Sequence, residues 1–384
     1  MNQQLRDYLS QLADQQTPKN CLPNQFYQDE QSHREEMKVL FARQWAAVEF
    51  AHAIPEPGDA KPVEFAGAPL LLVRTKEGAV KVYQNVCRHR GMILVEEPTK
   101  LQSVITCPYH GWCYGLDGRL RGTPMVGGHT ENSHPDIKRD ELGLLEVPSH
   151  VEFGTIFVNL DGNAAPFAEH FGELHEKWSE FIGRPTIFAG PESEFNLTVK
   201  GNWKLAVENY LDSYHLPFIH PGLNSYSPVQ EHYDYVGSNF AGQGSNAFRR
   251  AVGDGDRTFP LYPGLADKWL KGAEYPCLYP NLLLGLHCDH IFCMILMPLD
   301  HLTTLEKTAI FYADDQAKTA EYQDMRQEAA NGWKEVFQED IGVVEGMQRG
   351  RLAPDFDGGR LSPVMDGATH AFHKWAAREL VSTA

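Results

Sequence analysis

Two short segments of the chain each place one cysteine and one histidine beside a glycine, CRHRG at 87–91 and CPYHGW at 107–112. The four potential ligands, a C-x-H pair and a C-x-x-H pair, are Cys87, His89, Cys107 and His110. We expect each pair to lie on a short loop, so the fold has to bring both loops to one ion or cluster. Thiolate and imidazole ligands together suit zinc or an iron–sulfur centre. The motifs therefore predict a metal site between two loops, either structural or redox-active.

The residues around these motifs, 46–160, form short runs typical of strands, and glycines and prolines break the runs. Examples are APLLLVRT, VKVYQNV, SVITCP and FGTIFVNL. This pattern predicts a small antiparallel β domain. Residues 1–45 instead have helical spacing of apolar side chains, for example in DEQSHREEMKVLFARQW. We expect this N-terminal helical segment to pack on the domain that follows the β domain.

The remaining residues, 161–384, alternate between helical and strand patterns. Strands are expected in FNLTVKGN and LLLGLHCDHIFCMILMPL, and long helices from 317 to 349. The Gly- and Ser-containing residues 236–257 are typical of a flexible surface loop. The predicted fold class is therefore α+β, with an N-terminal antiparallel β domain followed by a domain of helices packed on an antiparallel sheet.

Length and charge narrow the possible functions. A chain of 384 residues is longer than one small core usually serves, which favours two domains. Lys and Arg number 34 against 51 Asp and Glu, and the formal charge of −17 disfavours nucleic acid and anionic membranes as partners. No apolar run approaches the roughly 20 residues that span a bilayer, and the polar N-terminus is unlike a signal peptide. The seven cysteines are irregularly spaced, so we expect a reducing, cytoplasmic location.

A second candidate site lies in ENYLDSYHLPFIHP, residues 208–221, where two histidines stand five positions apart. We expect a helix that begins after a capping residue, Asn202. On that helix Glu208, Asp212 and His215 would fall on one face, at i, i+4 and i+7.

The helix is expected to end or kink at Pro217, because a proline disfavours helical geometry in the residue before it. His220 would then return towards His215, so that both could bind one ion. Taken alone, histidines at this spacing are more often core or surface residues than ligands. The metal-site hypothesis therefore needs a third ligand.

A carboxylate that would complete such a site can be sought by pattern. In WKEVFQEDIGVVEGM an apolar stripe follows helical spacing, formed by Trp333, Val336, Phe337, Val343, Val344 and Met347. Asp340 lies within this stripe, whereas Glu339 and Glu345 fall outside it. A carboxylate on an apolar face is costly unless it is paired or binds a metal. Two histidines and one carboxylate with open positions are typical of non-haem iron sites that use dioxygen, although Asp340 could instead pair with a buried arginine or a helix backbone.

Three stretches together resemble the catalytic α subunits of the Rieske non-haem iron oxygenases. CRHRG…CPYHGWCY resembles the Rieske box, ENYLDSYHLPFIHP the iron motif, and QEDIGVVEGMQRG the segment that carries the carboxylate ligand. The resemblance implies a Rieske 2Fe–2S cluster on the two Cys–His pairs, and a mononuclear Fe(II) on His215, His220 and Asp340. Dioxygen would be the cosubstrate, and NAD(P)H electrons would arrive through a separate flavin- or ferredoxin-type reductase.

The resemblance also implies a homotrimer in which electrons pass from the cluster of one subunit to the iron of its neighbour. Carried onto this chain, Asp212 would be the bridge, linking His215 to His89 or His110 across the subunit interface. The plainer alternative is that Asp212 only orients the His215 ring within one subunit.

The layout looks closest to the single-subunit branch that oxidises choline, glycine betaine or stachydrine. This implies hydroxylation or N-demethylation of a small methylated or quaternary ammonium compound. Carnitine-type enzymes of this branch carry glutamate at the bridging position, where this chain has Asp212. Aromatic faces hold quaternary ammonium groups, and the candidates near the iron motif are Tyr210, Tyr214, Phe218 and Tyr226.

Three alternatives remain open from the sequence. The first is an oxygenase of the same family that hydroxylates an aromatic ring or an aromatic acid. The second is a non-catalytic Rieske electron carrier, and the third is a zinc-stabilised protein without redox function.

Overall fold

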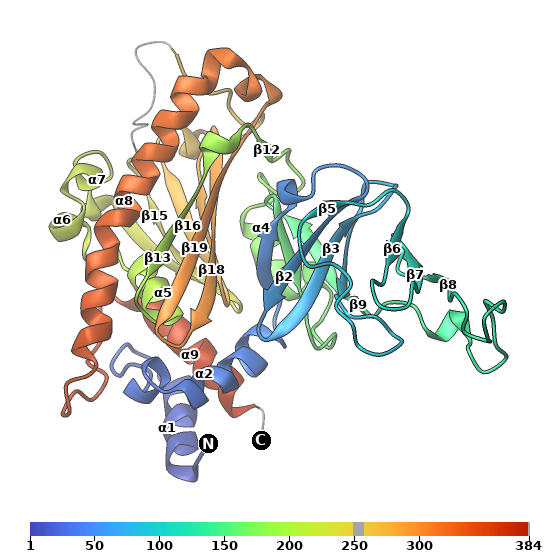
Figure 1. The fold of residues 1–384 in the computed structure, drawn as a ribbon. Coiled ribbons are helices and arrows are strands. Elements are labelled where there is room, and N and C mark those ends of the chain that lie inside the picture. Colours follow the sequence, from blue (N-terminus) through green and yellow to red (C-terminus); the bar gives the residue numbers. More distant parts are fainter. Residues whose placement is uncertain (249–256, 383–384) are drawn as a thin grey trace. The chain divides into compact units, whose positions relative to one another are not determined.

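The computed structural model describes residues 1–248 and 257–382 (Figure 1). The chain divides into two compact units, one made of Met1–Ala47 with Ala165–Ala384 and the other of Val48–Ala164. The expected domain boundaries at 46 and 160 lie close to these. The N-terminal segment belongs to the larger unit, together with the C-terminal part of the chain.

The N-terminal segment is helical and packs within the larger unit. Helix α1 (Gln3–Ala13) begins after Asn2, whose side chain accepts a hydrogen bond from a backbone N–H of the first turn. Helix α1 contacts α9 (Gly367–Val381), the last helix of the chain. Helix α2 (Glu30–Glu36) continues directly into a π-helical turn over Met37–Phe41. The helical segment expected at the N-terminus is therefore present.

The smaller unit is built from strands in three small sheets. Their orders are β5-β2-β3-β4-β9, β6-β7-β8 and β1-β11-β10. The bounds are β1 (Ala46–Phe50), β2 (Asp59–Phe65), β3 (Ala68–Arg74), β4 (Val80–Gln84), β5 (Thr99–Lys100), β6 (Val104–Thr106), β7 (Cys113–Gly115), β8 (Leu120–Gly122), β9 (Glu146–Val147), β10 (Ser149–Glu152) and β11 (Thr155–Val158). The pairs in the first two sheets are antiparallel, as the sequence predicted. One Cys–His segment follows β4, and the other joins β6 to β7.

The larger unit contains one antiparallel sheet of eight strands, in the order β12-β19-β18-β17-β16-β15-β14, with β13 also paired to β19. The bounds are β12 (Ile187–Phe188), β13 (Glu194–Val199), β14 (His232–Val236), β15 (Phe240–Ser245), β16 (Ala273–Leu278), β17 (Leu282–Leu286), β18 (His290–Asp300) and β19 (Thr303–Tyr312). The long apolar run LLLGLHCDHIFCMILMPL forms β17 and β18. Because β17 is buried on both faces, its apolar residues run continuously instead of alternating.

Two helices of the larger unit lie on the same side of this sheet and contact each other, α5 (Trp203–Leu211) and α8 (Gln323–Gly350) (Figure 1). Phe337 of α8 packs on Phe195 of β13, with ring centroids 6.2 Å apart. The other helices are α3 (Phe167–His170), α4 (Gly172–Lys177), α6 (Leu216–Ile219) and α7 (Pro221–Tyr226). The α+β fold class is confirmed, and in place of the long helices expected from 317 to 349 the structure has one, α8, which begins at Gln323.

The predicted flexible loop at 236–257 is wrong for the part that the structure describes. Residues Phe240–Ser245 form the fully buried strand β15 instead. A side chain at Gly242 would meet the ring of Tyr235, and one at Gly244 would meet Tyr233, within 2.7 Å. The glycines therefore make room for tyrosines of the neighbouring strand, although glycine is more often a sign of turns. Residues 249–256 lie outside the described part of the chain.

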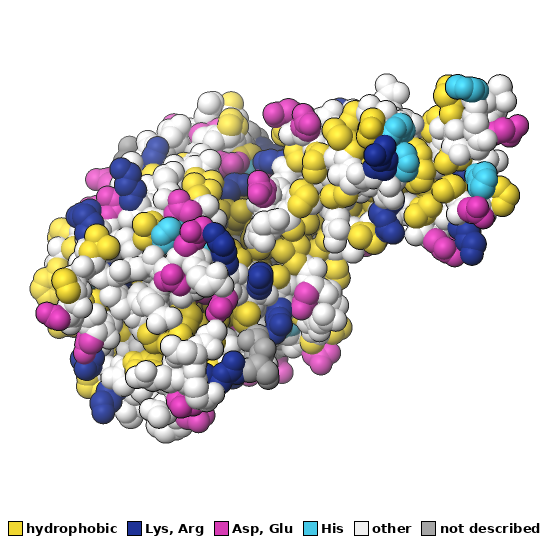
Figure 2. Space-filling model, turned by 60° about the horizontal axis from the view of Figure 1, so that its bottom comes forward, with side chains coloured by type: hydrophobic (Ala, Val, Ile, Leu, Met, Phe, Trp, Pro, Cys, Tyr) yellow, Lys and Arg dark blue, Asp and Glu magenta, His cyan; other side chains and the backbone are white. Residues whose placement is uncertain are grey.

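The surface and the helices give two further observations. Within residues 1–248 and 257–382, no helix is both long and apolar enough to cross a membrane. Figure 2 shows Lys and Arg side chains scattered among acidic and apolar ones over the face in view. A polyanion would therefore find no continuous basic patch on that face. The formal charge of the chain, −17, disfavours such a partner in the same way.

Candidate metal centres and substrate cavity

The two Cys–His loops of the smaller unit repeat the same backbone hydrogen bonds. Cys87 N–H donates to Met92 C=O (2.8 Å), and Gly91 N–H donates to Cys87 C=O (3.1 Å). In the second loop, the N–H of Cys107 and of the following glycine, Gly111, make the equivalent bonds at 2.8 and 3.1 Å. The two glycines have φ of +77° and +69°, a conformation that glycine adopts without strain. This explains why a glycine follows each pair in the sequence.

The cysteines and histidines of these loops differ in exposure. Cys87 and Cys107 are each 2% exposed, whereas His89 and His110 are exposed, with ring centroids 4.7 Å apart. The hydroxyl oxygen of Tyr114 lies 3.2 Å from Cys87 Sγ, so it can donate to a thiolate there. Buried thiolates and two histidines at the tip fit a cluster in which cysteines hold one iron and histidines the other.

The segment that carries the iron motif folds differently from the sequence prediction. Asn202 does cap α5, because its side-chain oxygen accepts from Lys204 N–H at 3.1 Å. The helix then ends at Leu211, and Asp212 is extended, with φ −98° and ψ 117°. The expected helical face of Glu208, Asp212 and His215 is therefore wrong. Glu208 instead lies 3.0 Å from His373 Nε2 and accepts from the Tyr27 hydroxyl, with 12% of its side chain exposed.

Pro217 begins a helix here instead of ending one. It lies in the first turn of α6, where its missing N–H has no partner to lose and its fixed φ suits the helix. His215 stands immediately before α6, and its C=O accepts from Phe218 N–H at 2.9 Å. His220 lies between α6 and α7, with φ −116° and ψ 61°. One short helix thus brings the two imidazole rings to a centroid separation of 5.0 Å.

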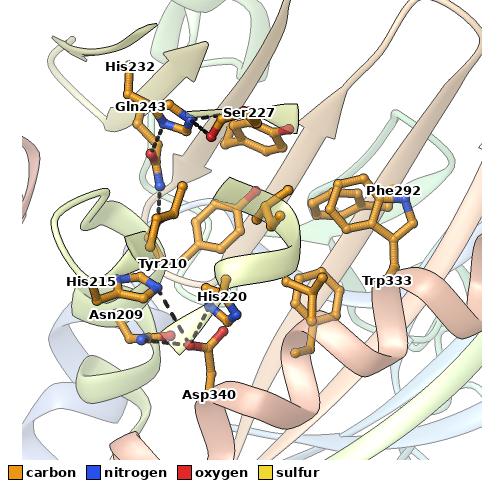
Figure 3. Close-up of a pocket in the computed structure, with 15 residues that line it drawn as sticks. Asn209, Tyr210, His215, His220, Ser227, His232, Gln243, Phe292, Trp333 and Asp340 are labelled. Atoms are coloured by element: carbon orange, nitrogen blue, oxygen red, sulfur yellow. Dashed lines mark hydrogen bonds and ion pairs between the residues drawn. The ribbon is translucent and has the colours of Figure 1, made fainter. Parts of the chain in front are cut away.

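Asp340 of α8 meets both histidines (Figure 3). Its Oδ1 lies 3.0 Å from His220 Nε2 and 3.6 Å from His215 Nε2. Among the described residues, these three form the only group of three or more His, Cys, Asp or Glu whose ligand atoms all lie within 4.8 Å of one another. Asn209 Nδ2 also donates to Asp340 Oδ1, at 3.1 Å. Two imidazoles and one carboxylate are the donor set of dioxygen-using non-haem iron sites.

Each histidine of this triad has a carboxylate on its other ring nitrogen. Asp212 Oδ2 lies 3.3 Å from His215 Nδ1, and Glu339 Oε2 lies 2.6 Å from His220 Nδ1. Such partners orient a ligating ring and make it more basic. Glu339 falls outside the apolar stripe, so the search for a buried carboxylate missed it. The signal that could have found it is its position next to Asp340 on the same helix.

A further carboxylate lies behind the triad and was also missed. Glu306 of β19 is 7% exposed and lines a small cavity together with Asp340 and Asn209. Burial, with a smaller contribution from the charge of Asp340, raises the pKa of Glu306 to about 8. The raised pKa favours the protonated, neutral form of Glu306 near neutral pH.

The triad forms one wall of a cavity with a volume of about 490 Å³, counted with its open side. The cavity is lined by Asn209, Tyr210, His215, Leu216, His220, Leu223, Ser227, His232, Gln243, Tyr275, Phe292, Trp333, Val336, Phe337 and Asp340. Trp333 is held in place because its Nε1–H donates to His290 Nε2 at 3.0 Å, and its ring packs on Phe292 at 4.5 Å. A mostly apolar cavity with a few polar groups is typical of small-molecule sites.

The substrate-pocket candidates from the sequence lie in different places. Tyr210 lines the cavity, and its hydroxyl donates to Leu284 C=O at 2.5 Å. Tyr214 and Phe218 do not line it and are 52% and 75% exposed, which corrects that expectation. Tyr226 lies outside the lining set and packs on Phe248 with ring centroids 5.8 Å apart.

The error has a physical reason. Closeness to the histidines in sequence suggested the pocket wall, but Tyr214 precedes α6, Phe218 lies on it, and both side chains are exposed to solvent. The aromatic walls come instead from strands and a helix distant in the sequence, through Tyr275, Phe292 and Trp333.

Comparisons with known proteins match both parts of the chain. Residues 189–382 match the family described as ring hydroxylating alpha subunit (catalytic domain), and residues 44–135 match the Rieske [2Fe-2S] domain. The carnitine monooxygenase oxygenase subunit of Acinetobacter pittii is 28% identical over 340 residues, covering 88% of this chain and 86% of that protein. The chloroplastic choline monooxygenase of Amaranthus tricolor is 26% identical over 364 residues, covering 93% and 77%.

One further relative is an oxygenase component of a dioxygenase system, and one further comparison is with a solved structure. The large oxygenase component of the 2,4-dinitrotoluene dioxygenase system of a Burkholderia species is 32% identical over 208 residues, covering 51% of this chain and 44% of that protein. The crystal structure of a quaternary ammonium Rieske monooxygenase with L-carnitine has a TM-score of 0.73 at 21% identity, covering 97% of this chain and 98% of that one.

The match to the Rieske [2Fe-2S] domain shows that the chain is a Rieske protein with an iron–sulfur cluster, so the alternative of a zinc-stabilised protein is wrong. The match to the catalytic domain and the relatives named as monooxygenases likewise count against the alternative of a non-catalytic Rieske electron carrier. The chain belongs to the ring-hydroxylating alpha subunits and is a Rieske oxygenase, an oxidoreductase with a Rieske cluster and a mononuclear iron.

Proposed function

We propose that this Rieske oxygenase is a monooxygenase that hydroxylates an N-methyl group of a small methylated or quaternary ammonium compound. One oxygen atom of dioxygen enters a methyl C–H bond, and two electrons with two protons reduce the other atom to water. The resulting N–CH₂OH group loses its hydroxyl proton, and the C–N bond breaks with its electron pair going to nitrogen. The products are formaldehyde and the demethylated amine.

One observation carries this proposal: the cavity beside the triad has aromatic walls and, among its described lining residues, no lysine or arginine. The rings are those of Tyr210, Tyr275, Phe292, Trp333 and Phe337. Aromatic faces attract a quaternary ammonium cation by about 0.5–2 kcal/mol each, most strongly for tryptophan. A positive lining group would oppose such a substrate. The proteins named as carnitine and choline monooxygenases among the relatives support the same substrate class.

The proposal assigns the metal ligands to residues. Cys87, His89, Cys107 and His110 would hold the cluster, and His215, His220 and Asp340 the iron. When bound, the iron supplies the activation of dioxygen. The chain's own side chains hold the ligands in place: Asn209 fixes Asp340 Oδ1, while Asp212 and Glu339 orient the two imidazoles. The apolar walls exclude water from the methyl group that reacts.

We further propose that electrons reach the iron from outside the subunit. A reductase of the flavin or ferredoxin type would carry them from NAD(P)H to the cluster, and a homotrimer would bring the cluster of one subunit to the iron site of the next. Asp212 is the bridge in this proposal. Its side chain touches His215 and stays 25% exposed, while His89 and His110 are exposed at the tip of their loops. The irregular spacing of the seven cysteines supports a reducing compartment such as the cytoplasm.

The test is an oxygen-consumption screen of the iron-loaded enzyme with a compatible reductase and NADH or NADPH. Methylated ammonium compounds are compared with aromatic acids at equal concentration, and formaldehyde is measured alongside. We expect oxygen consumption and formaldehyde with the ammonium compounds. Turnover of the aromatic acids alone, giving a phenol or a diol, would instead establish ring hydroxylation, which the partial match to the dinitrotoluene dioxygenase component favours.

A further inference from the structure

One end of the cavity is formed by a chain of hydrogen bonds between uncharged groups (Figure 3). Gln243 Nε2 donates to Tyr210 C=O at 3.1 Å, and Gln243 Oε1 lies 2.8 Å from His232 Nδ1. The other ring nitrogen, Nε2, lies 3.0 Å from Ser227 Oγ and 3.2 Å from Ser227 C=O. Gln243 is 6% exposed and Ser227 1% exposed. In Figure 3 this end lies on the far side of Tyr210 from the triad.

The direction of these hydrogen bonds follows from the groups that cannot donate. Because Tyr210 C=O only accepts, the amide of Gln243 must turn its nitrogen there and its oxygen towards His232. Nδ1 of His232 must then carry a proton. Burial lowers the pKa of His232, which keeps the ring neutral at pH 7 and leaves Nε2 without a proton.

The result is an excess of acceptors at this end of the cavity. His232 Nε2, Ser227 C=O and Ser227 Oγ all have lone pairs, and only the single hydroxyl proton of Ser227 is available among them. That proton goes to His232 Nε2 or to Ser245 Oγ, which is 3.0 Å away. In both cases at least one of these acceptors has no hydrogen-bond donor. Gln243 still has its second amide proton to donate.

This pattern distinguishes two kinds of ligand group. A hydroxyl both donates and accepts, so it can give its proton to Ser227 or His232 and accept the spare proton of Gln243. A carboxylate only accepts, so it would meet lone pairs at Ser227. It would also find no lysine or arginine among the described lining residues to offset its charge.

We infer that Ser227, His232 and Gln243 form a hydroxyl-binding end of the substrate cavity, so that the preferred substrate is a methylated amino alcohol and not a betaine. This inference rests on the proposed function and names the substrate class within it. It also fixes which carbon reacts. With the hydroxyl held at the end away from the triad, an N-methyl group is left beside the iron ligands, and the carbon that carries the hydroxyl is not oxidised.

The test measures binding of four matched ligands to the anaerobic holoenzyme by isothermal titration calorimetry. They are choline, ethyltrimethylammonium (choline without its hydroxyl), glycine betaine (the same cation with a carboxylate) and 3,3-dimethylbutan-1-ol (choline with carbon in place of nitrogen). We expect choline to bind about 5- to 10-fold more tightly than ethyltrimethylammonium, the contribution of one buried hydrogen bond. Glycine betaine should bind more weakly than both cations.

Ser227→Ala removes the hydroxyl and isolates its role. The ratio of the ethyltrimethylammonium Kd to the choline Kd should fall towards one, because only choline uses the hydroxyl. Ser227→Thr, which keeps a hydroxyl, should retain the ratio. Ser225→Ala is the matched control, since that exposed serine donates to Gly222 C=O outside the cavity. If Ser227→Ala does not fold, the four ligands on the unaltered enzyme still decide the question.

The outcomes separate this inference from the proposed function. Equal binding of choline and ethyltrimethylammonium, or tighter binding of glycine betaine, would overturn the hydroxyl-binding end and leave cation recognition intact. Tight binding of 3,3-dimethylbutan-1-ol equal to that of choline would overturn cation recognition and leave the hydroxyl-binding end intact. A loss in Ser227→Ala that is equal for both cations would make Ser227 merely structural and overturn its assignment.

Discussion

Glu339 Oε2 lies 2.6 Å from His220 Nδ1, on the opposite side of the ring from Asp340, whose Oδ1 faces Nε2 at 3.0 Å. Two consecutive residues of α8 thus hold one imidazole between them. In the proposed iron site, Asp340 would present the ligand oxygen, while Glu339 would fix the tautomer that leaves His220 Nε2 free to bind. The His215 ring is held less closely, because Asp212 lies 3.3 Å from its Nδ1 and also accepts from Tyr214 N–H.

Glu339→Gln is expected to weaken iron binding without affecting the Rieske cluster. Glutamine cannot provide the charged acceptor that makes the His220 ring a stronger ligand, and losses of about 10- to 100-fold in metal affinity follow such changes. The measurement is the retained mononuclear iron after dialysis against a chelator of stated strength. The visible spectrum of the cluster serves as the internal reference.

Glu335→Gln is the matched control, because Glu335 is an exposed carboxylate about one turn earlier on the same helix. It should retain as much iron as the unaltered protein. Equal iron retention in Glu339→Gln and Glu335→Gln would show that the 2.6 Å contact contributes nothing to the site.

Asp212→Asn is expected to leave both metal centres assembled and nearly abolish substrate oxidation. Asparagine can still accept from Tyr214 N–H, so the local fold should persist, but it removes the charge beside His215. The rate at which dioxygen reoxidises the cluster in the presence of substrate measures electron transfer from the cluster to the iron directly. Turnover close to that of the unaltered enzyme would rule out the bridging role.

Mixed assemblies test whether the electrons cross between subunits. Asp212→Asn chains have a cluster but a blocked iron site, and Cys107→Ser chains have an iron site but no cluster. When the two variants are coexpressed, mixed assemblies should regain part of the activity. The cluster of an Asp212→Asn chain can then pass electrons to the iron site of a Cys107→Ser chain. Electron transfer within one subunit predicts an inactive mixture.

Trp333→Leu is expected to lower the affinity for a quaternary ammonium ligand by about 2- to 30-fold, the range that one aromatic face contributes. Binding of the neutral isostere 3,3-dimethylbutan-1-ol should change less, because it loses only apolar contact. Trp333→Phe keeps an aromatic ring, so its affinity for the quaternary ammonium ligand should lie between that of the unaltered protein and that of Trp333→Leu. Equal losses for the charged and the neutral ligand would mean that Trp333 acts only as an apolar wall.

His170 gives the protein a defined sensitivity to acid. Burial lowers the pKa of His170 to about 4, below the ordinary value of 6.5, so its neutral form stabilises the fold. This contribution is present above pH 6.5 and is lost as the pH falls towards 4, because the unfolded chain then binds a proton that the folded chain does not. His170→Leu should narrow the difference in melting temperature between pH 7.5 and pH 5. An unchanged difference would contradict this assignment.

The sequence predicted those features that depend on local chemistry. The loops at 87–91 and 107–112 could be predicted because each needs a glycine at a fixed offset, and the α+β fold followed from strand and helix periodicity. Asp340 could be found because a carboxylate on an apolar stripe is costly without a partner. The cap at Asn202 was equally local.

What the sequence did not predict depends on where distant segments meet. The run after α5 was expected to stay helical through His215, because i, i+4 spacing looks the same whether or not a helix has ended. Pro217 suits either a helix end or a helix start, and only packing decides which. The walls of the cavity, Tyr275 and Phe292, lie on central strands of the sheet and look like ordinary core residues in the sequence.

The most direct test of the account uses choline labelled with ¹³C in all three N-methyl groups, with the reductase, NAD(P)H and dioxygen. We expect one labelled formaldehyde for each dioxygen consumed, together with N,N-dimethylethanolamine that keeps two labels. Labelled betaine aldehyde that retains all three methyl groups would contradict it, because the carbon beside the hydroxyl would then be the one that reaches the iron.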